Sequence, residues 1–217
     1  AQEHIREEKL GGKIATRLGN GLAPLEPGET DTVIIAGMGG DLICKILKAK
    51  PEFLIEGKEF ILQPQSEWFK VRRLLKEYHY QIEKEWFLKE DGKYYVIIKA
   101  EPAWTQPQRL KHQQPSIHEY IKEISETPAN QAVSEKDMES IYEQYGKYLI
   151  ETKNPVLKEY LEKEITKKES IAAELKQSIK EIESEELSGK DRGNIAKRQR
   201  RYQEIQKEIR DMRKAVG

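Results

Sequence analysis

One short stretch of this chain limits its possible folds more than any other. Residues 33–36 read Val-Ile-Ile-Ala, and Gly37, Gly39 and Gly40 follow directly. After them, residues 41–49 repeat apolar side chains at helical spacing. An unbroken apolar run is typical of a central parallel strand that is buried on both faces. A strand, a glycine turn and a helix in this order predict an α/β fold with a ligand site at the turn.

The segments around this stretch alternate between helix and strand patterns up to about residue 101. The sequence predicts the end of a helix at 1–10 and then three strands, at 13–18, 32–36 and 59–63. It predicts helices between the glycine turn and Pro51 and over 67–78, and two more strands at 81–88 and 93–101. An Asp-Gly pair joins the last two strands as a hairpin, whereas crossovers make the first three strands parallel. A hairpin that ends a doubly wound sheet is typical of class I methyltransferases.

The composition changes twice beyond residue 101. Residues 102–135 are polar and contain several prolines, so they read as a linker with at most one short helix at 118–124. Residues 136–217 are highly charged, and their apolar residues at heptad spacing predict two long helices. A break in this pattern at 184–194 predicts an antiparallel hairpin. We therefore expect a sheet domain at 1–101, a linker at 102–135 and a helical coiled-coil domain at 136–217.

Charge and cysteine content exclude several classes of protein. The 217 residues include 38 basic and 38 acidic side chains, so the net charge alone predicts no polyanionic partner. Residues 190–214, however, contain ten basic residues against four acidic ones. Cys44 is the single cysteine, which excludes an internal disulfide, and we expect it to be a small buried side chain.

Three further expectations concern metals, membranes and tryptophans. His4, His79, His112 and His118 lack the spacing of metal ligands, so we expect no metal. No apolar run approaches the roughly 18 residues of a membrane helix, and the charged first ten residues do not read as a signal peptide. We expect a soluble cytoplasmic protein that is not bound to a membrane. Trp68 and Trp86 are expected in the core, whereas Trp104 stays open between packing and base stacking.

The spacing of the glycine turn excludes the two common nucleotide-binding loops. A dinucleotide fingerprint needs a glycine where Leu42 stands and an acidic residue after the next strand, which ends in Gln63-Pro64. A phosphate loop needs Gly-Lys-Ser/Thr after the glycines, which this chain lacks. Two interpretations stay open: a tight turn with Asp41 as the helix N-cap, or a bare loop against which a flat ligand lies. Neighbouring strand ends with glycine and amide groups favour the second.

Five segments of the chain together resemble the bacterial tRNA (adenine-22-N1)-methyltransferases, the TrmK family, which use S-adenosylmethionine. They read RLGNGLAPL, VIIAGMGGDLICKIL, FILQPQ, EDGKYYVIIKAE and YGKYLIETKNPVLKEYLEKE. The resemblance covers residues 1–101 and most of 140–185. It implies a class I methyltransferase (Rossmann-like) domain followed by a helical coiled-coil domain that helps to hold tRNA. It also implies methyl transfer to N1 of one adenine of a bacterial tRNA.

The resemblance assigns roles to individual residues. The donor-binding residues would be Asn20, Gly21, Leu22, Ala36 and Gly37. The loop between the donor methyl group and the target base would be Gly37, Met38, Gly39 and Gly40. The substrate-binding residues would be Gln63 and Pro64. A basic helix such as 190–214 usually presents only a solvated face, but next to a tRNA methyltransferase domain we expect it to contact phosphates. Lys197, Arg198 and Arg201 are the expected contacts, because they cluster in one helical turn. Adenine N1 carries a lone pair, so orientation and desolvation can suffice and no general base is expected.

The chain departs from the family pattern in several places. Asn20 stands where the family has Asp, Lys147 stands where it has Pro, and the linker is longer. The family's loop for the methionine part of the donor and its acidic residue for the ribose have no counterpart, and would precede Ala1. We therefore expect a partial sequence, incomplete at its N-terminus, with a gap between its first two strands. By itself it would bind the donor poorly and be inactive.

Two other classes of function stay open at this point. One is a non-catalytic RNA-binding or coiled-coil interaction protein that uses the sheet as a scaffold. The other, a nicotinamide dehydrogenase, is disfavoured because the dinucleotide fingerprint fails.

Overall fold

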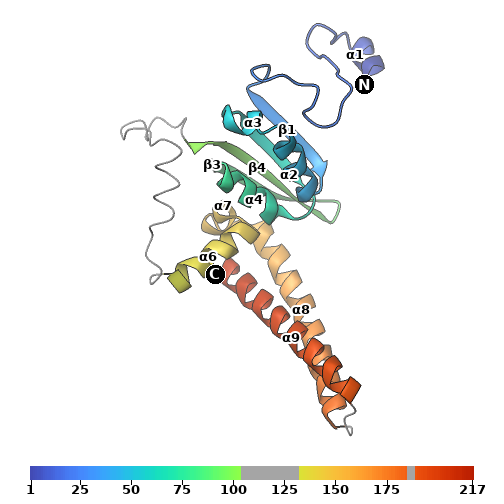
Figure 1. Ribbon diagram of the computed structural model, residues 1–217, viewed down its shortest axis with the longest axis vertical. Coiled ribbons are helices and arrows are strands. Elements are labelled where there is room, and N and C mark those ends of the chain that lie inside the picture. The colour runs from blue at the N-terminus through green and yellow to red at the C-terminus, as the bar shows by residue number, and fades with distance from the viewer. Residues whose placement is uncertain (104–131, 185–188) are drawn as a thin grey trace.

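The computed structural model describes residues 1–103, 132–184 and 189–217 (Figure 1). A four-stranded sheet carries helices against it, and a long helical hairpin extends away from it. The helix expected at 118–124, His112, His118 and Trp104 lie outside the described residues. The same holds for most of the expected linker.

The sheet has the strand order β1-β2-β4-β3. Its strands are β1 (Thr32–Met38), β2 (Glu59–Pro64), β3 (Tyr80–Glu90) and β4 (Lys93–Pro102). β1 and β2 are parallel, whereas β4 is antiparallel to both β2 and β3. The connection from β1 to β2 contains α2 (Gly40–Ala49) and α3 (Glu52–Ile55), and α4 (Trp68–Glu77) connects β2 to β3. The predicted terminal hairpin is confirmed.

The predicted strand at 13–18 is wrong. The chain leaves α1 (Gln2–Glu7) and turns, with the N–H groups of Lys13 and Ile14 donating to the carbonyl of Leu10. Residues 13–18 are exposed and are assigned no strand. Ile14 and Leu18 are 44% and 103% exposed and lie outside the core, so little packing offsets the cost of ordering this segment as a strand. The described sheet therefore has two parallel strands instead of the three expected.

One face of the sheet carries most of the core. Alternate residues of β2 and β4 are fully buried: Phe60, Leu62, Val96, Ile98 and Ala100. Residues four apart lie on one helix face, and Ile43 and Leu47 of α2 are both fully buried. In β1, however, only Val33 and Ile35 are buried, and Ile34 is 67% exposed. The expectation that β1 is buried on both faces is wrong, because β1 is an edge strand of the described sheet.

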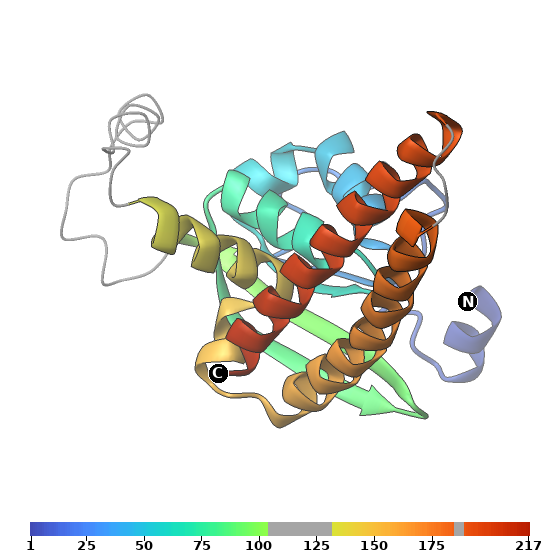
Figure 2. The same ribbon diagram turned by 90° about the horizontal axis from the view of Figure 1, so that it is seen from below.

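The C-terminal part consists of α6 (Ala132–Tyr145), α7 (Lys147–Glu151), α8 (Pro155–Ser184) and α9 (Gly189–Val216). α8 and α9 run side by side as an antiparallel hairpin (Figures 1 and 2). Pro155 begins α8 as predicted, and Asn154 Oδ1 accepts the N–H groups of Val156 and Leu157, both at 3.0 Å. The expected break at 184–194 is shorter, because α9 already begins at Gly189.

The base of the helical hairpin shares the core of the sheet. Ile141, Leu149 and Leu161 belong to the same buried cluster as the sheet residues. A second, small cluster of Ala172, Ile205 and Ile209 lies further along the hairpin. The division into domains at 101 and 136 stays a prediction.

The two described tryptophans differ in their surroundings. Trp68 packs against the core as expected, and Cys44 is half-buried beside it in the same cluster. Trp86, in contrast, lies outside this core and stacks under Lys84 Nζ, 5.0 Å from the ring centroid. The expectation for Trp86 is wrong, because its side chain points away from that of Phe87, its buried neighbour along β3.

Candidate functional site

The candidate site lies where β1 meets α2, at the carboxyl edge of the parallel strand pair. Ala36 pairs with Gln63 and Met38 pairs with Pro64, so Gly37 is the extra residue of a bulge. Gly37 has a φ of +78°, which side chains rarely tolerate. Its N–H donates to Gln63 Oε1 at 2.8 Å. The bulge and the Gln63 side chain therefore hold each other in place.

The three glycines of the turn meet different constraints. A Cβ on Gly37 would have no other atom within 4 Å, and residues 36–38 are exposed. A Cβ on Gly40 would lie 2.6 Å from the Glu67 carbonyl oxygen, and one on Gly39 would lie 3.2 Å from Ser66 Oγ. The Gly40 N–H also donates to the Ser66 carbonyl at 2.9 Å. Gly40 thus serves packing against the next loop, and Gly37 leaves open space for a ligand.

Gln63 presents a free hydrogen-bond donor at this edge. Because its Oε1 accepts from Gly37, the orientation of the amide is fixed and Nε2 points the other way. Gln63 Nε2 is buried, and it has no hydrogen-bond partner in the part of the chain that the structure describes. Buried donors in native proteins are nearly always paired with protein, water or ligand. This donor can therefore serve an acceptor of a bound molecule.

One interpretation predicted that Asp41 is the N-cap of α2, and this prediction is wrong. Gly39 occupies that position, and no side chain caps the helix. The Asp41 carboxylate instead lies 2.7 Å from Lys45 Nζ and 3.0 Å from Lys70 Nζ. Hydrogen bonds from Lys45 and then Lys70 lower the pKa of Asp41. A carboxylate with a lowered pKa is a poor general base, so this turn suits positioning better than proton transfer.

Two residues that sequence reasoning missed complete the turn. Glu67 has a φ of +52°, and its Oε2 accepts the Asp41 N–H at 3.3 Å. Ser66 provides the carbonyl that fixes Gly40. Their only sequence signal is a polar segment after Pro64, which predicts a loop but not its contacts.

The turn at residues 20–22 contacts the middle of α2. Gly21 has a φ of +57°, and a Cβ there would lie 2.8 Å from Ile46 Cγ2. Leu22 is buried in the core, whereas Asn20 is exposed. Ile46 lies about 9 Å along the helix from Gly40 at 1.5 Å per residue. Of the predicted site residues, the structure brings together 36–40 with Gln63 and Pro64, and places 20–22 further along α2.

The three basic residues predicted on α9 differ in their contacts. Lys197 is exposed, and within the described ranges it has no ion pair. Arg198 is half-buried and donates to Ser178 Oγ on α8. Arg201 pairs with Glu204 at 3.1 Å and Glu208 at 3.5 Å, and these carboxylates raise its pKa. All three lie in the first half of α9, which begins at the end of the hairpin that is far from the sheet (Figure 1).

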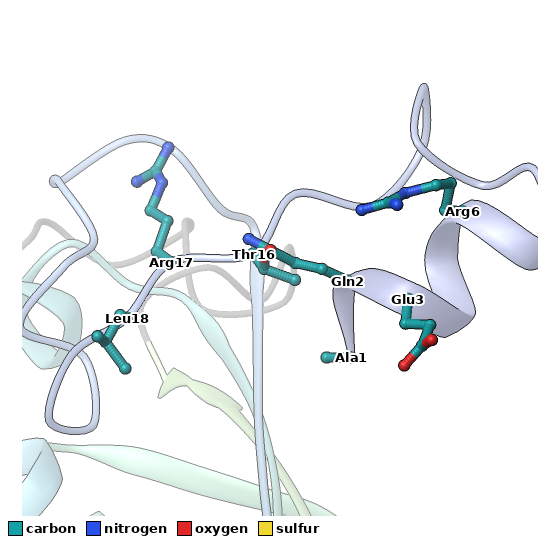
Figure 3. A pocket seen from close by; sticks show the side chains of 7 residues that line it. All are labelled: Ala1, Gln2, Glu3, Arg6, Thr16, Arg17 and Leu18. Carbon is teal, nitrogen blue, oxygen red and sulfur yellow. The ribbon is translucent and has the colours of Figure 1, made fainter.

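Two pockets of the described surface lie elsewhere. One of about 630 Å³ has α1 on one side and residues 16–18 on the other, with Arg6 and Arg17 among its lining side chains (Figure 3). Another of about 370 Å³ lies among α6, α8 and α9, where Tyr145 and Tyr160 line it. Neither pocket is lined by residues of the glycine turn. Residues 36–38 of the turn are exposed.

Residues 1–103, 132–184 and 189–217 contain no group of three or more His, Cys, Asp or Glu side chains that could hold a metal ion. Nor does any helix in these ranges combine the length and apolarity needed to cross a membrane.

Sequence comparison finds relatives of one kind. The sequence model of a family described as tRNA (adenine(22)-N(1))-methyltransferase, TrmK, matches residues 1–131. The tRNA (adenine(22)-N(1))-methyltransferase of Bacillus subtilis is 38% identical over 101 residues. This alignment covers 46% of the chain and 42% of that enzyme, so the chain spans less than half of that relative's length.

Solved structures share the fold. The B. subtilis m1A22 tRNA methyltransferase TrmK aligns with a TM-score of 0.64 at 22% identity, over 100% of this chain and 76% of that one. The TrmK of M. capricolum, in complex with S-adenosyl-homocysteine, aligns with a TM-score of 0.60 at 21% identity, over 99% and 74%. Another neighbour, from Streptococcus agalactiae, is described as a member of the NADB-Rossmann superfamily. These likenesses confirm the predicted Rossmann-like methyltransferase fold.

Proposed function

Because the chain belongs to the tRNA (adenine(22)-N(1))-methyltransferase family, we propose that the whole protein transfers the methyl group of S-adenosyl-L-methionine to N1 of adenine 22 in tRNA. Such an enzyme would act in the cytoplasm, where its substrate is found. The single observation that carries the proposal beyond family membership is the geometry at Gly37. There an exposed bulge and a buried, unpaired amide donor lie together at the carboxyl edge of the parallel strands.

This geometry suits a reaction that needs little from side chains. The lone pair of adenine N1 attacks the methyl carbon, so an N–C bond forms while the S–C bond of the sulfonium breaks. The positive charge passes from sulfur to the base, and no proton has to leave N1 during the transfer. An edge without a strong general base can therefore catalyse the step by orienting the two reactants and excluding water.

We assign the residues of this edge as follows. Gly37, Met38, Gly39 and Gly40 form the positioning loop, and Gly37 with Ala36 leaves room for the donor. Gln63 Nε2 donates to an acceptor of the bound base, and Pro64 lies beside that base. Asn20 and Gly21, with Leu22 beneath them, contact the adenine of the donor. The target base would have to leave its stack to reach this edge.

The tRNA body would contact α9 through Lys197, Arg198 and Arg201. Guanidinium and ammonium groups bind phosphates and release counterions, which makes the affinity depend on salt. Replacement of all three residues by glutamate should weaken tRNA binding and reduce the slope of affinity against salt concentration. An unchanged slope would remove these three residues from the proposed interface.

The decisive experiment is methyl transfer by the whole protein. Labelled S-adenosylmethionine and unmodified tRNA should yield one labelled nucleoside, 1-methyladenosine, which digestion and mass spectrometry place at position 22. A tRNA with guanine at position 22 is the matched control and should accept no label. Methylation at another position would contradict the proposed substrate. Binding of tRNA without any transfer would favour the alternative, a non-catalytic RNA-binding protein.

A further inference from the structure

A buried ion pair lies where the helical hairpin meets the sheet. Arg72 Nε on α4 donates to Glu85 Oε1 on β3 at 2.7 Å, and the two side chains are only 3% and 1% exposed. Arg72 Nη1 also donates to the carbonyl groups of Glu143 at 3.0 Å and Gln144 at 2.9 Å. These carbonyls belong to the last turn of α6. One guanidinium therefore connects a helix of the sheet, a strand and the end of α6.

The corner between α6 and α7 fits closely around this pair. Gly146 forms the corner with a φ of +92°. A Cβ at this position would lie 2.4 Å from Glu85 Oε2 and 2.9 Å from Arg72 Nη2. Among the described residues, neither of these two atoms has a hydrogen-bond partner. The backbone of Gly146 thus occupies the space in front of them, and a side chain could not.

Stability alone does not explain a buried pair at this place. Replacing a buried ion pair by apolar residues of similar size is often neutral or stabilising. Apolar contacts, however, have no preferred direction, whereas the hydrogen bonds of a planar guanidinium fix the groups that it joins. Arg72 bonds to Glu85 and to the end of α6 at once. Its geometry therefore specifies the direction in which α6 leaves the sheet.

A second contact holds the start of α8 on the same part of the sheet. The Tyr160 ring lies 5.5 Å from that of Phe87 and 5.0 Å from that of Tyr94. The neighbouring Glu159 accepts hydrogen bonds from Lys89 Nζ at 2.6 Å and from the Tyr94 hydroxyl at 3.2 Å. Because α6 packs against α9 in the shared core, the contact at Arg72 also holds the hairpin, and the base of the hairpin is attached at two separate places. Two attachments fix the direction of the helices, whereas a single attachment would let them rotate about it.

The length of the hairpin makes its direction important. α8 has 30 residues. At 1.5 Å per residue it spans about 45 Å, so a rotation of about 10° at the base would move the far end by about 8 Å. Lys197, Arg198 and Arg201 lie in the first half of α9, which begins at that end of the hairpin (Figure 1). Arg198 bonds to Ser178, which lies about 35 Å from the start of α8 at 1.5 Å per residue, so the same rotation would move this region by about 6 Å. A displacement of this size is comparable to the spacing between successive phosphates along one strand.

We propose that Arg72 is a positioning residue for tRNA. Held by Glu85 and bonded to the end of α6, it sets the direction of the α8–α9 hairpin. The cations of α9 and the turn at Gly37 can then contact one tRNA molecule at the same time. The role of Arg72 in setting the hairpin direction follows from the contacts alone, whereas its role in tRNA binding rests on the proposed function.

Distances within the protein test the first role. Spin labels are attached to cysteines at Glu52 on α3 and Gln203 on α9, both exposed, after Cys44→Ala has removed the native thiol. The double variant Arg72→Met with Glu85→Leu removes both buried charges, which avoids leaving one unpaired. We expect a broader or shifted distance distribution than in the parent protein. The single variant Arg72→Lys keeps a charge beside Glu85 but loses the planar fork, and should also broaden the distribution.

Binding of tRNA tests the second role. In both variants the affinity for unmodified tRNA should fall about tenfold or more, because two contact regions no longer meet their sites together. Arg73→Gln is the matched control, because Arg73 also bonds to Glu143 at the end of α6, but through a side chain that is 63% exposed, so this pair contributes little. It should change neither the distances nor the affinity.

The possible results separate the two proposals. An unchanged distance distribution in folded variants would overturn the role of Arg72 in setting the hairpin direction. If Arg72 only added stability, its replacement would lower the melting temperature and leave the distances unchanged. Broader distances with unchanged tRNA affinity would overturn the link to tRNA. If the parent protein bound no tRNA, the proposed function would fail. The distances would still decide whether Arg72 sets the hairpin direction.

Discussion

At the scale of single residues, positions 37 and 40 are both glycine, but for different reasons. Gly37 needs a left-handed backbone and has free space beside it, whereas Gly40 lies against the backbone of Ser66 and Glu67. The first constraint concerns conformation, and the second concerns contact. Substitution by alanine should separate them.

We expect Gly40→Ala to destabilise the protein more than Gly37→Ala. A Cβ at Gly40 would force the neighbouring loop to move, which costs about 1–3 kcal/mol in well-packed sites. At Gly37 the cost is conformational, about 1–2 kcal/mol at most for one residue. Urea denaturation of both variants measures the free energies of unfolding. A larger loss for Gly37→Ala would show that the loop beside Gly40 yields easily.

A second prediction concerns the amide of Gln63. Gln63→Glu keeps an acceptor for the Gly37 N–H but replaces the free donor with another acceptor. Because a carboxylate oxygen replaces the buried Nε2, we expect a somewhat lower melting temperature. In the folded variant the rate of methyl transfer should fall by up to about tenfold, the loss of roughly one hydrogen bond. Gln65→Glu is the matched control, because the Gln65 side chain is exposed two residues further on. Equal rates for the two variants would contradict a substrate role for Gln63.

Sequence reasoning reached part of this site. It predicted that the glycine turn and Gln63 lie at one sheet edge, because carboxyl ends of parallel strands meet there. It could not predict that Gly40 serves packing, since its partners Ser66 and Glu67 lie in another loop with no local signal. The orientation of the Gln63 amide could not be predicted either, because it depends on a hydrogen bond from one backbone N–H of β1.

At the scale of elements, β1 shows how a pattern can mislead. Its unbroken apolar run predicted burial on both faces, yet Ile34 is largely exposed while its neighbours Val33 and Ile35 are buried. Hydrophobicity reports which residues can be buried, and the position of the strand in the sheet decides which are. The segment 13–18 was predicted as a strand, and among the described residues no strand pairs with it. Helices were easier to predict, because their periodicity depends only on the segment itself.

The docking of α8 on the sheet should weaken in acid. Hydrogen bonds from Lys163, Lys89 and then Tyr94 lower the pKa of Glu159 from 4.5 to about 2. A carboxyl group whose pKa is lower in the folded state stabilises that state above its unfolded pKa, and the contribution is lost as the pH falls. The melting temperature of the parent should exceed that of Glu159→Gln at neutral pH. This difference should shrink between about pH 4.5 and 2.

Melting curves of both proteins across this range provide the measurement. Lys89→Gln removes one partner of Glu159 and should reproduce part of the difference at neutral pH. A difference that stays constant down to pH 2 would mean that Glu159 contributes through something other than its charge.

At the scale of the whole molecule, the sheet and the base of the hairpin should unfold together. Leu161 of α8 is fully buried in the core that includes Val96 of β4, whereas Ile205 belongs to the separate cluster further along the hairpin. Leu161→Ala should lower the free energy of unfolding by about 2–5 kcal/mol and reduce amide protection throughout the sheet. Ile205→Ala should instead increase exchange only near the far end of the hairpin.

Native-state hydrogen exchange of the two variants distinguishes these outcomes. Uniform loss of protection in Ile205→Ala would mean that the hairpin and the sheet form one cooperative unit along their whole length. The sequence predicted two regions with different composition, and it could not show where their cores join. That junction depends on Arg72 and Glu85, which are 13 residues apart, and on carbonyls some 70 residues away.

The corner at Gly146 should restrict which substitutions related proteins accept during evolution. A side chain at this position would occupy the space of the Arg72 and Glu85 side chains, so none of the three can be replaced freely while the other two remain. Related sequences should therefore keep Gly, Arg and Glu at these positions as a set, or lose all three in the same lineage. An alignment of many relatives can test this, because a lone substitution at any one of them should be rare.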